Sequence, residues 1–298
     1  MEHLALGLAL LSGMLATGST PRRRDLNPVT EMALDMARTS FDDQYQGCSR
    51  MMEEELEELN RTEFDTNSIY AQAWTLAAAE WRSRRGDMPQ PRVLRPVQAI
   101  ALMAYTLHSP PLYRAFNVAV REAGRSRQEY LGTFHFKVLH FLLSEALRAL
   151  RDARPHHCHR VYRGVQGIRF TAQHQESIRF GHFASASLQN KSTQHFGQDT
   201  IFSVETCYGV PIRDFSFFPE EEEVLIPPFE SFKVTNVTRK GNRALIELRS
   251  LAAHSIYNCE FVKEKRCKNQ PCVFSAGKSG PGDPPRLWGF ILAATALA

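Results

Sequence analysis

Hydrophobic residues recur at helical spacing through the first half of the chain. Apolar positions three and four residues apart alternate with charged positions, which is typical of amphipathic helices that cover a core. One stretch, residues 97–106, is apolar throughout and fits either a helix or a strand. We therefore predict a mainly helical segment up to about residue 152. The predicted helices cover residues 51–59, 70–81, 113–123 and 135–151.

After residue 155 the pattern changes to short apolar runs separated by glycine, proline and Asn/Asp-rich turns. Such runs are typical of β-strands. Helices followed by strands, without regular alternation, predict an α+β fold and argue against a doubly wound parallel sheet. The predicted strands cover residues 161–165, 201–207, 224–226, 232–237 and 244–248.

The composition is that of an ordinary globular protein, with 43% hydrophobic and 23% charged residues among 298. This length suffices for one large domain or two small ones. The net charge of +4 is too small to indicate a nucleic-acid-binding protein, and no basic stripe interleaved with aromatic residues occurs. Neither GxGxxG nor GxxxxGK[ST] is present, so the sequence does not support a Rossmann or P-loop nucleotide site.

Both ends of the chain carry targeting patterns. Residues 4–15 are apolar, too short to span a bilayer and followed by small residues, so we predict a signal peptide over residues 1–18. Near the other end, Ser275 begins a small triplet, a polar spacer follows, and residues 287–298 are apolar. This order indicates a GPI-anchor signal, with Ser275 as the attachment site and residues 276–298 removed. The alternative is a secreted protein with a short apolar tail.

The six cysteines fit an extracellular protein, because an even count in a secreted chain indicates three disulfides. Their pairing stays open on this evidence. Asn60, Asn190 and Asn236 each begin an N-glycosylation sequon. Together with the end patterns, these features predict a glycoprotein of the secretory pathway.

Cys158 lies within the run His156-His157-Cys158-His159, which has the composition of a metal site. Adjacent residues on one short segment can hardly all face one ion, and no second cluster with ligand spacing follows. We therefore predict a disulfide for Cys158 and no metal site.

Four consecutive glutamates occupy residues 220–223, between Pro219 and the apolar run 224–226. The prolines around them exclude a long helix, so a turn should deliver acidic side chains to the start of a buried strand. Like charges this close raise one another's pKa, which is typical of functional sites. Taken alone, an acidic surface turn is the simpler interpretation.

Two predicted strands upstream carry polar side chains. Arg163 lies within an apolar strand, which is costly unless its guanidinium faces an anion, and Gly164 would let a ligand approach the backbone closely. An internal salt bridge is the alternative for Arg163. Ser185 and Ser187 alternate along a further strand, so they share one face and could line a ligand-binding surface.

An arginine strand, a Ser-x-Ser strand and a Glu-x-Glu pair before an apolar strand resemble, in this order, the R-S-ExE signature of the arginine-specific ecto-mono-ADP-ribosyltransferases. The resemblance includes the GPI-anchored type-1 and avian members and covers nearly the whole mature chain. It implies one ADP-ribosyltransferase domain over residues 19–275, with the NAD cleft between a helical part (about 40–152) and a β-rich catalytic part (about 156–262). Further matching segments are residues 41–45, 123–127, 162–165, 183–185 and 223–228.

The family cleaves the bond between nicotinamide and ribose in NAD and passes ADP-ribose to an arginine. The resemblance implies that Glu223 binds the ribose and stabilises an oxocarbenium-like transition state. Glu221 would orient and deprotonate the acceptor guanidinium, which is barely nucleophilic at neutral pH. The run also permits the register Glu220-x-Glu222, but the spacing to Val224 favours the later pair.

The resemblance also implies which residues bind the co-substrate, NAD or NADP, without a metal. Arg163 would clamp the diphosphate, Gly164 would allow its close approach, and Ser185 would hold the nicotinamide side. Tyr105 and Ser216 lie in segments that resemble further NAD contacts.

In such a family the cysteines would pair as Cys48–Cys259 and Cys158–Cys207, which leaves Cys267–Cys272. The implied partners are NAD and arginine-containing target proteins, with the membrane reached only through the anchor and no nucleic acid. Two other functions stay open: an NAD glycohydrolase that uses water as acceptor, and a non-enzymatic cell-surface binding module. The intact R-S-ExE signature argues against the module.

Overall fold

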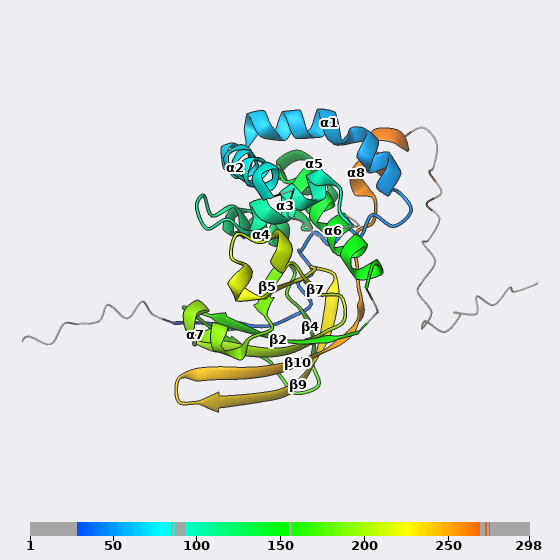
Figure 1. Ribbon diagram of the computed structural model, residues 1–298. Coiled ribbons are helices and arrows are strands. Elements are labelled where there is room, and N and C mark those ends of the chain that lie inside the picture. The colour runs from blue at the N-terminus through cyan, green and yellow to red at the C-terminus, as the bar shows by residue number, and fades with distance from the viewer. Residues whose placement is uncertain are drawn as a thin grey trace, which may run out of the picture.

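The computed structural model describes residues 29–84, 86, 93–154, 157–268, 272 and 274. Helices from the first half of the chain form one layer, and a sheet from the second half forms the other (Figure 1). The predicted α+β fold is confirmed. The predicted signal peptide, Ser275 and the tail behind it lie outside the described residues.

The helical layer follows the predicted pattern closely. Helix α3, the segment left open between helix and strand, begins with a proline in its first turn and is buried along almost its whole length. A helix surrounded by core has no polar face, which explains its uniformly apolar sequence. The helices of this layer are α1 (Ser49–Thr66), α2 (Ser68–Arg84), α3 (Pro96–Thr106), α4 (Leu112–Ala123), α5 (Arg127–Thr133) and α6 (Lys137–Asp152).

The main sheet has eight strands in the order β4-β9-β10-β6-β2-β5-β8-β7. Strands β10 and β6 are parallel, and the other neighbouring pairs are antiparallel. Its strands are β2 (His159–Val165), β4 (Ser177–Arg179), β5 (Ala184–Ser187), β6 (Thr200–Thr206), β7 (Val210–Pro211), β8 (Glu223–Ile226), β9 (Glu230–Lys240) and β10 (Arg243–Ala253). A separate parallel pair joins β1 (Thr30–Ala33) to β3 (Ile168–Thr171). Two short helices, α7 (Thr193–Phe196) and α8 (Glu260–Arg266), complete the described elements together with single 3-10 turns.

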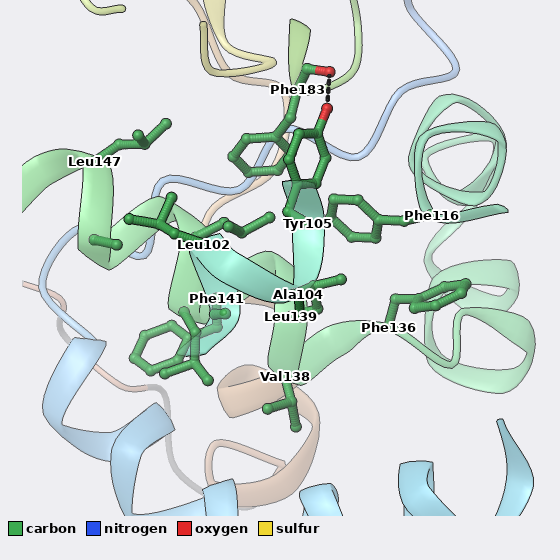
Figure 2. Close-up of a cluster of buried hydrophobic side chains, with 14 of the residues drawn as sticks. Leu102, Ala104, Tyr105, Phe116, Phe136, Val138, Leu139, Phe141, Leu147 and Phe183 are labelled. Atoms are coloured by element: carbon green, nitrogen blue, oxygen red, sulfur yellow. Dashed lines mark hydrogen bonds between the residues drawn. The ribbon is translucent and has the colours of Figure 1, made fainter. Parts of the chain in front are cut away.

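The two layers share one core. Phe183, at the start of the serine strand, packs among helical residues, and its ring lies beside those of Phe116 and Tyr105 (Figure 2). Leu225 of β8 belongs to the same cluster, whereas Val224 and Ile226 face a second core on the other side of the sheet. The alternation along β8 therefore fixes this strand against both cores.

The N-terminal segment before α1 fastens the helical layer to the end of the sheet. Asp42 forms a fully buried ion pair with Arg179 and accepts hydrogen bonds from the backbone N–H groups of Ile256 (2.9 Å) and Tyr257 (3.0 Å). The Cys48–Cys259 disulfide lies in the same region. Both residues of the ion pair are paired and hydrogen-bonded, so their burial is compensated.

Three disulfides join the cysteines in the pairs that the family resemblance implies. They are Cys48–Cys259, Cys158–Cys207 and Cys267–Cys272.

Candidate active site

A cavity of about 370 Å³ lies between the helical layer and the sheet. This volume is within the range of small-molecule sites. Its walls come from α3, the segment after it, α4, β2, β5, α7 and the glutamate run. The lining residues already singled out in the sequence are Tyr105, Arg163, Gly164, Ser185, Ser187, Glu221 and Glu223.

The glutamate run forms the predicted turn into a buried strand. A single 3-10 turn covers Pro219–Glu221, Glu222 adopts left-handed backbone angles (φ 46°), and Glu223 begins β8. Because Glu222 turns the chain, Glu221 and Glu223 both line the cavity, whereas Glu220 is exposed. The later of the two possible registers is thus the one that brings both its carboxylates to the cavity.

Backbone contacts hold this turn against the serine strand. The Ser187 hydroxyl donates to the carbonyl oxygen of Glu221 (2.7 Å), and the N–H of Leu188 donates to that of Glu222 (3.2 Å). On the other edge, Ile212 N–H donates to the Glu223 carbonyl (2.9 Å). Ser187 therefore fixes the backbone of the turn in addition to lining the cavity.

Glu223 is 6% exposed, and its burial raises the pKa of its carboxyl to about 7. The neighbouring Ser185 hydroxyl opposes this rise, the negative charge of Glu221 adds to it, and Arg163 and Ser216 also lower the pKa. The site therefore holds a carboxylate whose charge is poorly solvated, so a positive charge placed beside it would be strongly stabilised.

The raised pKa predicts a pH-dependent cost to stability. An unfolded glutamate titrates near 4.5, whereas the folded Glu223 carboxyl keeps its proton up to about pH 7. Because the unfolded chain loses this proton first, the wild type should lose stability as the pH rises from about 4.5 to 7. The Glu223→Gln variant lacks this cost. Its unfolding free energy relative to the wild type should rise by up to about 3 kcal/mol between about pH 4 and pH 8.

Denaturant unfolding at the two pH values, without ligand, measures this difference. Glu222→Gln is the matched control, because its carboxyl does not line the cavity. An equal pH response of the Glu223 and Glu222 variants would contradict a buried, perturbed Glu223.

Arg163 lies at the centre of β2, where its backbone pairs with β6. One guanidinium nitrogen donates to the carbonyl oxygen of Ser185 (2.6 Å), which joins β2 to β5 and holds the cation at the cavity. Burial lowers the pKa of Arg163, while Tyr105 and Glu223 raise it. The site thus presents a fixed cation beside the Glu223 carboxyl.

Gly164 lines the cavity, and the packing around it gives a further reason for its missing side chain. A Cβ at this position would meet the carbonyl oxygens of Gly197 at 2.3 Å and Thr193 at 2.9 Å. The α7 segment therefore packs directly on the backbone of β2, and any larger residue would displace it.

Tyr105 is buried at the floor of the cavity. Its hydroxyl donates to the carbonyl oxygen of Phe183 (2.8 Å; Figure 2) and accepts from the Asn117 side-chain N–H (3.0 Å). Burial raises the pKa of Tyr105 to about 12, so the phenol is neutral. Through the bond to the Phe183 carbonyl, Tyr105 supports the start of the serine strand.

Asn117 is a cavity residue that the sequence analysis missed. Its amide also donates to the Phe183 carbonyl (3.0 Å), and its side-chain oxygen is buried without a partner in the described structure. This oxygen is closed to solvent as well, so Asn117 contributes to the cavity wall through its contacts with Tyr105 and the Phe183 carbonyl. Its sequence signal is weak: a polar residue one turn after Tyr113, beside the buried face of α4.

Ser216 does not line the cavity. It is fully buried, lies near the Glu223 carboxyl, whose pKa it lowers, and accepts from the N–H of Phe218 (3.0 Å). The structure thus shows Ser216 next to Glu223, and the NAD contact that the resemblance implies stays a prediction.

The other candidate features lie away from the cavity. Cys158 is in a disulfide, and no group of three or more His, Cys, Asp or Glu side chains among the described residues could hold a metal ion. Asn190 and Asn236 are exposed, whereas Asn60 is half-buried and accepts a hydrogen bond from Tyr70 (2.7 Å). In the part of the chain that the structure describes, no helix is long and apolar enough to cross a bilayer.

Comparison with known proteins gives a consistent result. The family model for NAD:arginine ADP-ribosyltransferases matches residues 34–256. The erythroblast NAD(P)(+)--arginine ADP-ribosyltransferase of Gallus gallus is 56% identical over 94% of this chain and 92% of its own length. The GPI-linked NAD(P)(+)--arginine ADP-ribosyltransferase 1 of Homo sapiens is 46% identical over 98% of this chain and 93% of its own.

Among solved structures, a mutant of the eukaryotic mono-ADP-ribosyltransferase ART2.2 in complex with NADH is similar, with a TM-score of 0.66 and 37% identity. The match covers 76% of this chain and 98% of that chain.

Proposed function

This chain belongs to the NAD:arginine ADP-ribosyltransferase family, and we propose that it transfers ADP-ribose from NAD to arginine side chains of target proteins and releases nicotinamide. One observation carries the proposal. Arg163, Ser185, Glu221 and Glu223, which lie far apart in the sequence, line a single cavity between the two layers.

The cavity suits a dinucleotide in its chemistry. Arg163 offers a fixed guanidinium to the diphosphate, and guanidinium groups bind phosphate oxygens through parallel hydrogen bonds. The Asn117 amide forms part of the same wall and holds the Tyr105 hydroxyl and the Phe183 carbonyl. NADP carries the same diphosphate and is the alternative co-substrate.

Glu223 would promote loss of nicotinamide. When the bond from ribose C1′ to the nicotinamide nitrogen breaks, its electron pair leaves with nicotinamide and the ribose gains positive charge. A buried carboxylate stabilises that charge more than it stabilises the ground state. The positive nicotinamide ring of bound NAD would also favour the ionised form of Glu223, whose pKa is near neutrality.

Glu221 would then activate the acceptor. The arginine guanidinium must lose a proton before one of its nitrogens can form a bond to C1′, and a carboxylate at the same cavity can accept it. The turn at Glu222 separates the two carboxylates, so each step has its own group.

The test is incubation of the purified protein with NAD labelled in its adenylate part and agmatine, an arginine analogue. We expect release of nicotinamide, with labelled ADP-ribosyl-agmatine as the main labelled product and free ADP-ribose as the minor one. Labelled ADP-ribose without the adduct would indicate an NAD glycohydrolase, and absence of NAD turnover would indicate a binding module.

We place this activity on the outer cell surface through a GPI anchor. The proposal rests on the pattern at residues 1–18 and 275–298 and on the GPI-linked human relative. The same assay on intact cells tests it: an inositol-lipid-specific phospholipase should move the activity into the medium. Activity that is in the medium before treatment would indicate a secreted protein.

A further inference from the structure

The segment before the glutamate run is held against the helical layer by side chains of α2 and the end of α3. Arg84, the last residue of α2, donates to the carbonyl oxygen of Ser216 (2.8 Å), and its guanidinium carbon lies 5.5 Å from the ring centre of Phe217. The Thr106 hydroxyl accepts from Phe217 N–H (3.2 Å). The imidazole of His108 stacks on the ring of Phe218, with 3.9 Å between the ring centres.

Arg84 is oriented within its own helix. Glu80, one turn earlier, forms an ion pair with its Nε, and the side chain is 31% exposed. With Nε held by Glu80, the outer nitrogen Nη1 points to the Ser216 carbonyl. A guanidinium presents these donors in a fixed geometry, which an ammonium group does not.

The contacts continue from Ser216 to both carboxylates. The Ser216 hydroxyl lies near the Glu223 carboxyl, whose pKa it lowers, and accepts from Phe218 N–H (3.0 Å); the Phe218 carbonyl accepts from Glu221 N–H (3.1 Å). Arg84 does not line the cavity, so it could act on the reaction only through this segment.

The two glutamates depend on this segment to different degrees. Glu223 is the first residue of β8 and pairs with Ser187 in the sheet, and Ser185 contacts its carboxyl. Glu221 lies outside the sheet, in the 3-10 turn, between the Ser187 contact on one side and the Arg84-held segment on the other. Loosening the segment should therefore displace Glu221 more than Glu223.

We propose that Arg84 is a positioning residue that holds the Glu221 turn for acceptor binding and so sets the partition between transfer to arginine and hydrolysis of NAD. This inference rests on the proposed function.

The test compares Arg84→Met, which keeps an unbranched apolar stem near Phe217 but has no donor, with Arg84→Lys, which keeps charge and a donor. Arg82→Ala is the matched control, because Arg82 is exposed in the same last turn of α2. We expect Arg84→Met to lower the ratio of ADP-ribosyl-agmatine to ADP-ribose by about tenfold, which is the effect expected when a hydrogen bond from a charged group is lost. The KM for agmatine should rise, the KM for NAD should stay within about twofold, and the lysine variant should be intermediate.

Two outcomes would overturn the inference. One is a ratio in Arg84→Met equal to that of Arg82→Ala. The other is an equal fall of nicotinamide release and of transfer in Arg84→Met, together with a lower melting temperature. That result would indicate a structural role. The wild type separates these from failure of the proposed function, because a wild type that forms no agmatine adduct contradicts the function itself.

Discussion

Replacing Glu223 by glutamine should abolish both NAD cleavage and transfer of ADP-ribose. Glutamine has nearly the same shape and can still contact Ser185 and Ser216, but it carries no negative charge to oppose the charge that develops on the ribose. Loss of one preorganised electrostatic partner lowers turnover by roughly 10³-fold. Release of nicotinamide, measured with and without agmatine, should fall by at least that factor in both conditions.

Glu222→Gln is the control for this substitution, because it also removes a charge from the run but at a side chain that does not line the cavity. It should retain nicotinamide release within a few-fold of the wild type. A larger loss in Glu222→Gln than in Glu223→Gln would show that the register of the glutamate pair is wrong.

Replacing Glu221 by glutamine should separate the two activities. Nicotinamide release in the absence of agmatine should persist, because Glu223 keeps its contacts with Ser185 and Ser216. The pKa of the Glu223 carboxyl should also fall in this variant, because the negative charge of Glu221, which raises that pKa, is removed. Transfer to agmatine should fall by roughly 10²-fold or more, the usual contribution of a positioned general base.

Quantification of ADP-ribosyl-agmatine and free ADP-ribose in the same reaction measures this separation. Glu220→Gln is its control, because Glu220 is exposed next to Glu221. Equal losses of both products in Glu221→Gln would contradict separate roles for the two carboxylates.

Helices were predictable where one face is buried and the other is exposed to solvent. Helix α4 buries one side and shows the pattern clearly, and it ends at Ala123 as predicted. Helix α3 was ambiguous because core surrounds it, so its sequence has no polar face to give a period. Short strands such as β1 and β7 have too few residues to show a period of two, and their pairing depends on distant partners.

The signature residues were predictable because their order along the chain resembles a known family. Their geometry was not. Gly164 is required by the packing of α7 on β2, and Ser216 lies next to the Glu223 carboxyl. Neither contact can be inferred from the local sequence. Arg84 contacts a carbonyl 132 residues away, and Asn117 faces Phe183 from another element, so their importance arises only from tertiary structure.

The central claim is that two alternate glutamates of the run carry two different steps. One measurement tests it most directly: single Glu→Gln variants at positions 220, 221, 222 and 223, incubated with labelled NAD and agmatine, with both products quantified. We predict wild-type product ratios for the variants at 220 and 222, ADP-ribose without adduct at 221, and neither product at 223. Loss of both products at 222, or formation of the adduct at 223, would contradict the claim.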